Sequence, residues 1–393
     1  MLNAFFIPTS GSSVMYWRIQ SFVEAAWRSG LASFQNPLWY KDLNKIQPWQ
    51  EAITDGDKYD AMFIRQFVPM IESGCQQADA VVFQYAHMEG ALELFDSIKI
   101  KYPHLPVLVE IDDNILSVPT YNEAHDVFDP RSEIRKRVLS QIRAADGVIA
   151  STNYLKEVFS EYNKNIYVVP NSIDFKAWDN LKTKSKKGIR IGWAGGNGHG
   201  GDFDTIQDAI IKILAKYPKA TLVLANGPAK GGVPDWIKGH KQVEYHSASE
   251  WVPILKYPKF LANLDIDIGI APLIDSAFNR GKSNLKWLEN SALGIPTVAA
   301  NVGPYAECIR PGQDGFLADN DAEFFAALDC LISNRKTRKS MGMAAKERIR
   351  QDYNINKTVV RYIDCLQKAI DLKGIPTTAE KDYVSNEVNL GVS

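Results

Sequence analysis

Short runs of β-branched and aromatic residues alternate with helix-length amphipathic segments along all 393 residues, and this alternation limits the fold more than any other feature. Short runs that are apolar at nearly every position are typical of strands buried on both faces of a parallel sheet. Parallel strands need long crossover connections, which the intervening helices supply. The pattern therefore predicts an α/β protein of doubly wound parallel sheets covered by helices.

The alternation divides into two halves at a polar, cationic stretch over residues 182–187. The predicted strands of the first half are Ala4–Ile7, Ala80–Gln84, Val107–Ile111, Gly147–Ala150 and Ile166–Val169. Its predicted helices are Val14–Ser29, Tyr59–Ser73, Gly90–Lys101, Arg131–Ala144 and Tyr154–Tyr162. The predicted strands of the second half are Ile189–Trp193, Ala220–Ala225, Val243–Tyr245, Ile266–Ile270 and Thr297–Ala300. Its predicted helices are Phe203–Lys216, Asp321–Ser333, Thr337–Asp352 and Lys357–Leu372.

These elements predict two domains. We expect the first over residues 1–170, a linker over 171–187 and the second over 188–352. Residues 353–373 are expected to form a helix that crosses back to the first domain, and residues 374–393 a disordered polar tail.

Composition limits the location and the class of partner. The formal net charge of −1 gives no overall basic field for nucleic acid. No apolar run reaches the roughly 18 residues of a membrane span, and the first residues lack the features of a signal peptide. We therefore expect a cytoplasmic protein without an integral membrane segment, with peripheral membrane contact left open. The four scattered cysteines are expected to be buried thiols, with neither zinc nor disulfides.

The segment from Ala271 to Gly294 predicts an anion site. A strand leads into a loop with Arg280 and Lys282, and a helix is expected to begin at Ser283. The first N–H groups of a helix lack intrahelical partners and carry partial positive charge, so nearby cations complete a cradle for a diphosphate. Lys282, Lys286 and Glu289 would share one face of this helix. A carboxylate close to a phosphate cradle suits a ribose diol, so the implied ligand is a nucleoside diphosphate.

A glycine-rich loop follows the first strand of the second half, at the same expected sheet edge. The sequence from Gly196 to Gly201 fits G-x-G-x-x-G, the dinucleotide fingerprint. A nicotinamide site also needs an acid at the end of the next strand, which instead ends in Ala225-Asn226-Gly227. We therefore favour a phosphate-binding turn, with His199 as a donor, and keep an NAD-dependent oxidoreductase as a weaker alternative.

Two other motifs are rejected. Gly281-Lys282-Ser283 would close a Walker A loop, but that motif needs a glycine at position 276, where the chain has Ser276. Asp265 and Asp267 form a D-x-D, but they stand at the start of a strand, away from the ligand edge, so we expect a structural role and no metal.

The acids that end the third strand of the first half are candidates for acceptor binding. Glu110, Asp112 and Asp113 exceed what a helix cap needs, and they are expected to face a cleft between the domains. Asp112 and Asp113 are also catalytic candidates, because a carboxylate can steady a charged intermediate. Further residues expected on the acceptor side are Ser10, Gly11, Ser12, Tyr16, Arg18, Gln84 and His87.

Several of these motifs resemble those of a known family. They are Ile191-Gly-Trp-Ala-Gly-Gly, Asn279-Arg-Gly-Lys-Ser-Asn-Leu-Lys-Trp-Leu-Glu289, Gly294-Ile-Pro-Thr-Val and Gly312-Gln-Asp-Gly-Phe-Leu317. They are similar to the nucleotide-sugar domain of family-4-like, retaining GT-B glycosyltransferases, over roughly Ile166 to Asp352. The resemblance implies two Rossmann-like domains that face each other across a cleft, with the first domain receiving the acceptor.

The resemblance also implies roles for individual residues. Glu289 corresponds to the second glutamate of the family's E-x7-E motif, which binds the donor ribose. Lys282, Ser283 and Asn284 would meet the diphosphate, with His199 or Arg280 helping to neutralise it. Gly281 stands where many members have the first glutamate, which contacts the sugar. The full set of expected donor residues is Gly195, Gly196, Asn197, Gly198, Lys282, Ser283, Asn284, Leu285, Lys286 and Glu289, and the catalytic set is Asp112, Asp113, His199, Arg280 and Lys282.

The predicted function is that of a hexosyltransferase-type glycosyltransferase. It would use a nucleotide-diphosphate sugar, with UDP favoured, as co-substrate and need no other cofactor. Retention without a metal and a glycan or glycolipid precursor as acceptor are expected. A basic helix with Arg131, Arg135, Lys136, Arg137 and Arg143 keeps modified DNA bases as an alternative acceptor. The missing glutamate at position 281 keeps open a nucleotide-sugar-binding protein without transferase activity.

Overall fold

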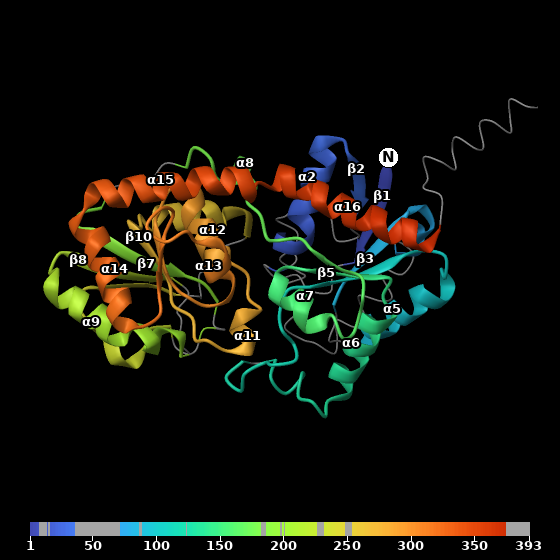
Figure 1. Ribbon diagram of the computed structural model, residues 1–393, viewed down its shortest axis with the longest axis horizontal. Coiled ribbons are helices and arrows are strands. Elements are labelled where there is room, and N and C mark those ends of the chain that lie inside the picture. The colour runs from blue at the N-terminus through green and yellow to red at the C-terminus, as the bar shows by residue number, and fades with distance from the viewer. Residues whose placement is uncertain are drawn as a thin grey trace, which may run out of the picture. The chain divides into compact units, whose positions relative to one another are not determined.

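The computed structural model describes residues 1–7, 14, 16–35, 71–85, 89–122, 124–181, 186–196, 199, 201–225, 232–247 and 254–374. The chain divides into two compact units (Figure 1). Unit 1 consists of Met1–Leu116, Asp126–Pro170 and Ile355–Ser393, and unit 2 of Ser117–His125 and Asn171–Asn354. Residues 117–125 thus group with the second unit, although the sequence places them within the first predicted domain.

Unit 1 is built on a six-stranded parallel sheet of order β2-β1-β3-β4-β5-β6. Its strands are β1 (Leu2–Ile7), β2 (Ala32–Gln35), β3 (Ala80–Gln84), β4 (Val107–Ile111), β5 (Gly147–Ala150) and β6 (Ile166–Val168). The chain runs from β1 outward to β2 and then returns to the other side of β1 at β3. This reversal of direction is a topological switch point, beside which ligands bind in open α/β sheets.

The helices of unit 1 connect and cover these strands. They are η1 (Tyr16–Gln20), a π-helical turn, followed by α2 (Ser21–Ser29), α5 (Glu89–Lys101), α6 (Glu133–Ala144), α7 (Asn153–Phe159) and α16 (Ile355–Lys373). The last of these, α16, packs against β1 and α2 (Figure 1), where the buried ring of Tyr362 contacts Phe6 and Phe22. The C-terminal helix therefore completes the core of unit 1.

Unit 2 has a second six-stranded parallel sheet, of order β12-β11-β10-β7-β8-β9. Its strands are β7 (Ile189–Ala194), β8 (Ala220–Ala225), β9 (Val243–His246), β10 (Ile268–Ala271), β11 (Thr297–Ala300) and β12 (Phe316–Ala318). The chain runs from β7 to β9 and then crosses to the other side of β7 at β10. The switch point of this sheet lies between β7 and β10.

The helical segments of unit 2 alternate with its strands. They are α8 (Phe175–Trp178), η3 (Asp202–Ile206), α9 (Gln207–Lys216), η4 (Asp235–Ile237), η5 (Ile254–Lys256), α10 (Tyr257–Asn263), α11 (Ala277–Arg280), α12 (Leu285–Ala292), α13 (Gly303–Cys308), α14 (Asp321–Ser333) and α15 (Arg335–Asp352). Gly294 has a φ of 73° just after α12, so it ends this helix in the left-handed conformation that the sequence predicts.

The predicted fold class is confirmed: both sheets are parallel, doubly wound and flanked by helices. The edge strands β2 and β12 were not predicted, because their short runs carry little periodicity. The helix expected from Ser283 begins instead at Leu285, since α11 takes up part of the preceding loop. Most of the predicted helix Tyr59–Ser73 and of the 182–187 stretch lies outside the described residues. No helix among the described residues is both long and apolar enough to cross a membrane.

Candidate active site

The candidate site of unit 2 lies at its switch point, where the chain leaves the carboxyl ends of β7 and β10. The loop after β7 contains Gly195, Gly196 and His199, and the loop after β10 leads through α11 into α12. The sequence predicts that these two loops lie at one edge of the sheet. Because β7 and β10 are neighbours in the same parallel sheet, this edge brings both loops together.

Asp202 ties the two loops to each other. Its fully buried carboxylate accepts hydrogen bonds from His199 Nδ1 at 2.8 Å, from the Ile274 backbone N–H at 2.9 Å and from Asn279 Nδ2 at 3.1 Å. A buried carboxylate with several donors is a rigid connection, because breaking any one bond leaves a desolvated polar group. Asp202 therefore fixes the glycine-rich loop against the segment that contains Lys282. Sequence reasoning missed it, since it starts a 3-10 helix and looks like an ordinary first-turn acid.

His199 enters this site as a neutral imidazole. Its ring lies edge-on against Trp193, with centroids 5.3 Å apart. Burial, reinforced by the positive charge of Lys286, lowers the pKa of His199 from 6.5 to about 4, against the opposing effect of its hydrogen bond to Asp202. The Nδ1–H that bonds Asp202 leaves Nε2 as an acceptor in the neutral ring. The role of His199 beside a diphosphate stays a prediction, and a bound diphosphate would favour the protonated ring.

The lowered pKa of His199 predicts a loss of stability in mild acid. The unfolded protein takes up a proton on this side chain near pH 6.5, whereas the folded protein resists it until about pH 4. The contribution is thus complete above pH 6.5 and is lost as the pH falls toward 4, by up to about 3 kcal/mol. Urea unfolding at pH 7 and at pH 5 measures it. A His199→Gln variant should lose less stability between these pH values than the wild type, and equal losses would contradict the assignment.

The segment between β10 and α12 carries the predicted phosphate-binding residues. Lys282 lies over the ring of Phe278, with its Nζ 4.6 Å from the centroid, and is partly exposed. Ser283 Oγ accepts a hydrogen bond of 2.9 Å from Asn171 Nδ2. Asn284, the N-cap of α12, makes no side-chain capping bond to the first turn. The first N–H groups of α12 thus have no side-chain cap from this residue, and Lys282 lies three residues before the helix.

Two predictions for this segment need correction. Because α12 begins at Leu285, Lys282 lies outside it and does not share a helical face with Lys286 and Glu289. Arg280 forms a bidentate ion pair with Asp275, with Nη2 donating to Oδ2 at 2.7 Å, and about half of its side chain is exposed. A guanidinium already paired to a neighbouring carboxylate is a weaker partner for a phosphate than Lys282.

Glu289 is buried, and Lys286, one turn before it on α12, is half-buried. Lys286 Nζ donates to the carbonyl of Ala194 at 2.8 Å and lies 4.3 Å from the Trp193 ring centroid. Glu289 Oε2 accepts a hydrogen bond of 3.1 Å from the hydroxyl of Tyr257. Burial lowers the pKa of Lys286 and raises that of Glu289, while their mutual attraction opposes both shifts. Tyr257, on α10, was not predicted, and no local motif marks it.

Gly195 is required for this arrangement. A Cβ at Gly195 would lie 2.3 Å from Lys286 Nζ and 2.8 Å from the Trp193 ring, so Gly195→Ala forces Lys286 away from Ala194. Such overpacking costs about 1–3 kcal/mol. Gly196→Ala is the matched control, because a Cβ there meets no atom within 4 Å. Thermal unfolding should show a clear loss for Gly195→Ala and a smaller one for Gly196→Ala. Equal melting temperatures would mean that Lys286 is not held as described.

Two of the predicted acceptor residues of unit 1 do not lie on its surface. Arg18 and Glu110 are both fully buried and form an ion pair, with Arg18 Nε donating to Glu110 Oε1 at 2.5 Å. Arg18 Nη1 also donates to the carbonyl of Val169 at 2.9 Å. Their predicted contact with an acceptor is therefore wrong for the described state: the acid at the end of β4 is neutralised inside the unit.

The other predicted acceptor residues of unit 1 differ in their exposure to solvent. Asp112 and Asp113 are half-buried just after β4, and their charges add to burial in raising the pKa of Tyr85 well above its usual value. Tyr16 and Gln84 are buried. Ser10, Gly11, Ser12 and His87, like Asn197 and Gly198 of unit 2, lie outside the described residues. Asp112 and Asp113 are thus the partly exposed acids of the predicted acceptor set.

Each basic residue of this predicted helix in unit 1 contacts a neighbouring group. Arg131 pairs with Asp129, Lys136 with Glu133 and Arg137 with Asp96. Arg135 donates to the carbonyls of Leu116 and Phe128, and Arg143 lies over the Tyr162 ring at 4.8 Å. Surface ion pairs of this kind are weak and can exchange for a phosphate, so modified DNA bases stay a predicted alternative acceptor.

The chain is similar to known proteins in family, sequence and fold. Residues 219–364 match the model of a family described as "Glycosyl transferase-like". Trehalose synthase of Pyrococcus horikoshii is 28% identical over 177 residues, or 42% of this chain and 40% of that protein. TuaH of Bacillus subtilis, named provisionally as a teichuronic acid biosynthesis glycosyltransferase, is 23% identical over 251 residues, or 59% of this chain and 61% of that protein. The chain therefore matches less than two thirds of the length of either relative.

Solved structures share the fold over nearly the whole chain. Anabaena Alr3699/HepE, solved in complex with UDP and glucose, has a TM-score of 0.62 at 14% identity and covers 94% of this chain and 100% of its own. Sucrose-phosphate synthase from Thermosynechococcus elongatus has a TM-score of 0.61 at 13% identity and covers 95% of this chain and 100% of its own. At these identities the likeness establishes the fold alone.

The fold and the family match agree with the resemblance predicted from the motifs. The chain has the GT-B fold, and its residues 219–364 match the "Glycosyl transferase-like" family model. The matched family region includes the whole segment from Lys282 to Glu289, so the residues that carry the predicted donor site fall within it.

Proposed function

We propose that the protein transfers a sugar from a UDP-sugar to an acceptor hydroxyl. The observation that carries this proposal is the group at the switch point of unit 2: Lys282 just before α12, Lys286 held at the end of β7, and Glu289 one turn further into the helix. Two cations beside a helix N-terminus suit a diphosphate, and a buried carboxylate suits the hydroxyls of a ribose.

The choice of UDP draws on the structural neighbours. HepE was solved in complex with UDP and glucose, and a trehalose-6-phosphate protein from E. coli with UDP-2-fluoro glucose. The second has a TM-score of 0.59 and covers 95% of this chain. These are properties of those proteins. They make a UDP-sugar the first donor to test here.

The proposed chemistry follows from the charge of the leaving group. Breaking the anomeric C–O bond leaves the electron pair on the diphosphate and an oxocarbenium-like sugar. Fixed cations and helix N–H groups stabilise this developing negative charge, so the site needs no metal in this proposal. We propose retention of configuration, with the acceptor hydroxyl attacking from the side of the leaving phosphate, whose oxygen accepts the acceptor's proton.

The proposed acceptor is a glycan or glycolipid precursor. Asp112 and Asp113 are half-buried at the carboxyl end of β4, where each can accept a hydrogen bond from a sugar hydroxyl. The name of the relative TuaH, which refers to teichuronic acid, a polysaccharide, is consistent with this class. Asp112→Asn and Asp113→Asn variants test it: both should weaken acceptor binding and leave donor binding unchanged.

A second function, binding of a nucleotide sugar without transfer, is favoured by one observation. Gly281 provides no carboxylate at the position that contacts the sugar in many related enzymes. Under this alternative the protein binds the donor but neither transfers nor hydrolyses its sugar.

One experiment tests both functions. We expect a UDP-sugar to raise the melting temperature more than GDP- or dTDP-sugars, because a ligand that binds only the folded state stabilises it. At a concentration about 100 times Kd the gain is about 2.7 kcal/mol. The stabilising sugar is then incubated with glycan and glycolipid acceptors. Transfer supports the first function, stabilisation without transfer or hydrolysis supports the second, and no stabilisation by any nucleotide sugar contradicts both.

A further inference from the structure

Unit 2 has a pocket at the opposite end of its strands from the candidate donor site. It lies beside Asp265, Ile266 and Asp267, which precede β10, and Gly294, Ile295 and Pro296, which precede β11. The cavity volume is about 380 Å³, within the range of small-molecule sites. Because the loops of the donor site leave the carboxyl ends of the same strands, an occupant of this pocket does not overlap a donor.

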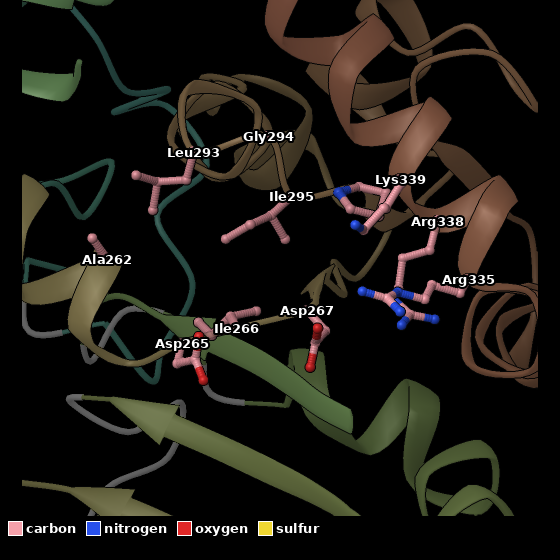
Figure 2. A pocket seen from close by; sticks show the side chains of 11 residues that line it. Ala262, Asp265, Ile266, Asp267, Leu293, Gly294, Ile295, Arg335, Arg338 and Lys339 are labelled. Carbon is pink, nitrogen blue, oxygen red and sulfur yellow. The ribbon is translucent and has the colours of Figure 1, made fainter. Parts of the chain in front are cut away.

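One wall of the pocket is cationic. Figure 2 shows Arg335, Arg338 and Lys339, from the first turns of α15, on one side and Asp265, Ile266 and Asp267 on the other. Among the described residues, none of these three cations forms an ion pair. Arg338 is only 9% exposed and donates from Nη1 to the carbonyls of Leu331 and Ile332. Its Nε and Nη2 have no hydrogen-bond partner in the described part of the chain.

The position of these cations costs stability in the unliganded protein. The N-terminal end of a helix carries partial positive charge, so basic side chains in its first turns are unfavourable and acids are favoured. The first turn of α15 contains no acid, and its N-cap is the uncharged Asn334. An anion bound between the three cations relieves both the dipole repulsion and their mutual repulsion.

The opposite wall of the pocket indicates which chemical groups the anionic ligand carries besides its negative charge. Asp267 Oδ2 accepts the backbone N–H of Arg190 at 2.9 Å, and Asp265 Oδ2 accepts that of Lys186, so both carboxylates are fixed in place. Burial raises the pKa of Asp267, which a hydroxyl donor in the pocket would counteract. Ile266, Leu293 and Ile295 add apolar surface that suits a carbon skeleton.

We infer that this pocket binds a small phosphate monoester of a polyol. The phosphate lies against Arg335, Arg338 and Lys339, and hydroxyl groups donate to Asp265 and Asp267. The site is separate from the proposed donor site, and binding there requires no transfer activity.

The inference is tested by calorimetric titration of the full chain with glycerol 3-phosphate, inorganic phosphate and glycerol, with excess UDP added to fill the donor site. We expect glycerol 3-phosphate to bind with a Kd below about 1 mM, and glycerol not to bind. The Arg335→Glu/Lys339→Glu double variant changes two exposed residues and should bind at least about tenfold more weakly. Lys336→Glu is the matched control, since Lys336 is an exposed cation of the same helix that does not line the pocket.

Asp267→Asn tests the polyol part, because an asparagine oxygen still accepts the Arg190 N–H. It should weaken binding of glycerol 3-phosphate and leave inorganic phosphate unaffected. Three results would overturn the inference: no saturable binding of either phosphate, equal affinity in the double variant and the Lys336→Glu control, or an Asp267→Asn variant that binds glycerol 3-phosphate like the wild type. Because the readout is anion binding, a wild type without sugar transfer contradicts the proposed function and not this site.

Discussion

Lys282→Ala is expected to lower the turnover number for sugar transfer by about 10²–10³, the usual cost of removing one fixed positive group from a developing negative charge. Lys282 is partly exposed over the Phe278 ring and makes no ion pair among the described residues, so its loss should leave the fold intact. Steady-state kinetics with the donor identified by thermal stabilisation provides the measurement. Lys282→Arg keeps the charge and should retain more activity than the alanine variant.

The control for Lys282→Ala is Lys212→Ala, which removes an exposed lysine from α9, and it should turn over like the wild type. Glu289→Ala should lower kcat/KM for the donor by about 10–100-fold, through the lost hydrogen bonds to the ribose. Normal turnover in both Lys282→Ala and Glu289→Ala would refute the proposed donor site.

Arg18→Met is expected to destabilise the protein by about 3–5 kcal/mol, the usual cost of leaving one member of a buried ion pair uncompensated. Both side chains are fully buried, so the carboxylate of Glu110 is left without its partner and away from water. The Arg18→Met/Glu110→Leu double variant should recover most of the loss, because replacing both charges by apolar groups is often neutral. Chemical unfolding followed with a probe in unit 1 provides the measurement.

The pH dependence gives a further check on Arg18→Met. Burial already raises the pKa of Glu110, and Arg18 opposes this shift. Without Arg18 the pKa of the folded state rises further, so the defect is largest at high pH and shrinks as the carboxyl group becomes protonated. A loss that does not depend on pH, or a double variant as unstable as Arg18→Met, would mean that the ion pair does not carry the stability assigned to it.

The parallel sheets were predictable because their strands are apolar on both faces, as Val81–Phe83 and Val107–Val109 illustrate. The end of α12 at Gly294 was predictable because glycine readily adopts the left-handed conformation that often ends a helix. The segment from Lys282 to Glu289 could be proposed as a site because cations and a carboxylate follow a strand at short spacing. In each case the signal is local in sequence.

The features that sequence reasoning missed depend on contacts between distant residues. Glu110 was read as a surface acid because its partner Arg18 is 92 residues away. Tyr257 contacts Glu289 from another helix across 32 residues. Asp202 binds Ile274 and Asn279, which follow a different strand. A single sequence gives no signal for such pairs, and only the fold brings them together.

The most direct measurement is a crystal structure of the protein with UDP. We expect the diphosphate within hydrogen-bonding distance of Lys282 and the first backbone N–H groups of α12, with the ribose hydroxyls on Glu289. UDP bound elsewhere in the molecule, or a pocket without nucleotide density at saturating UDP, would contradict it.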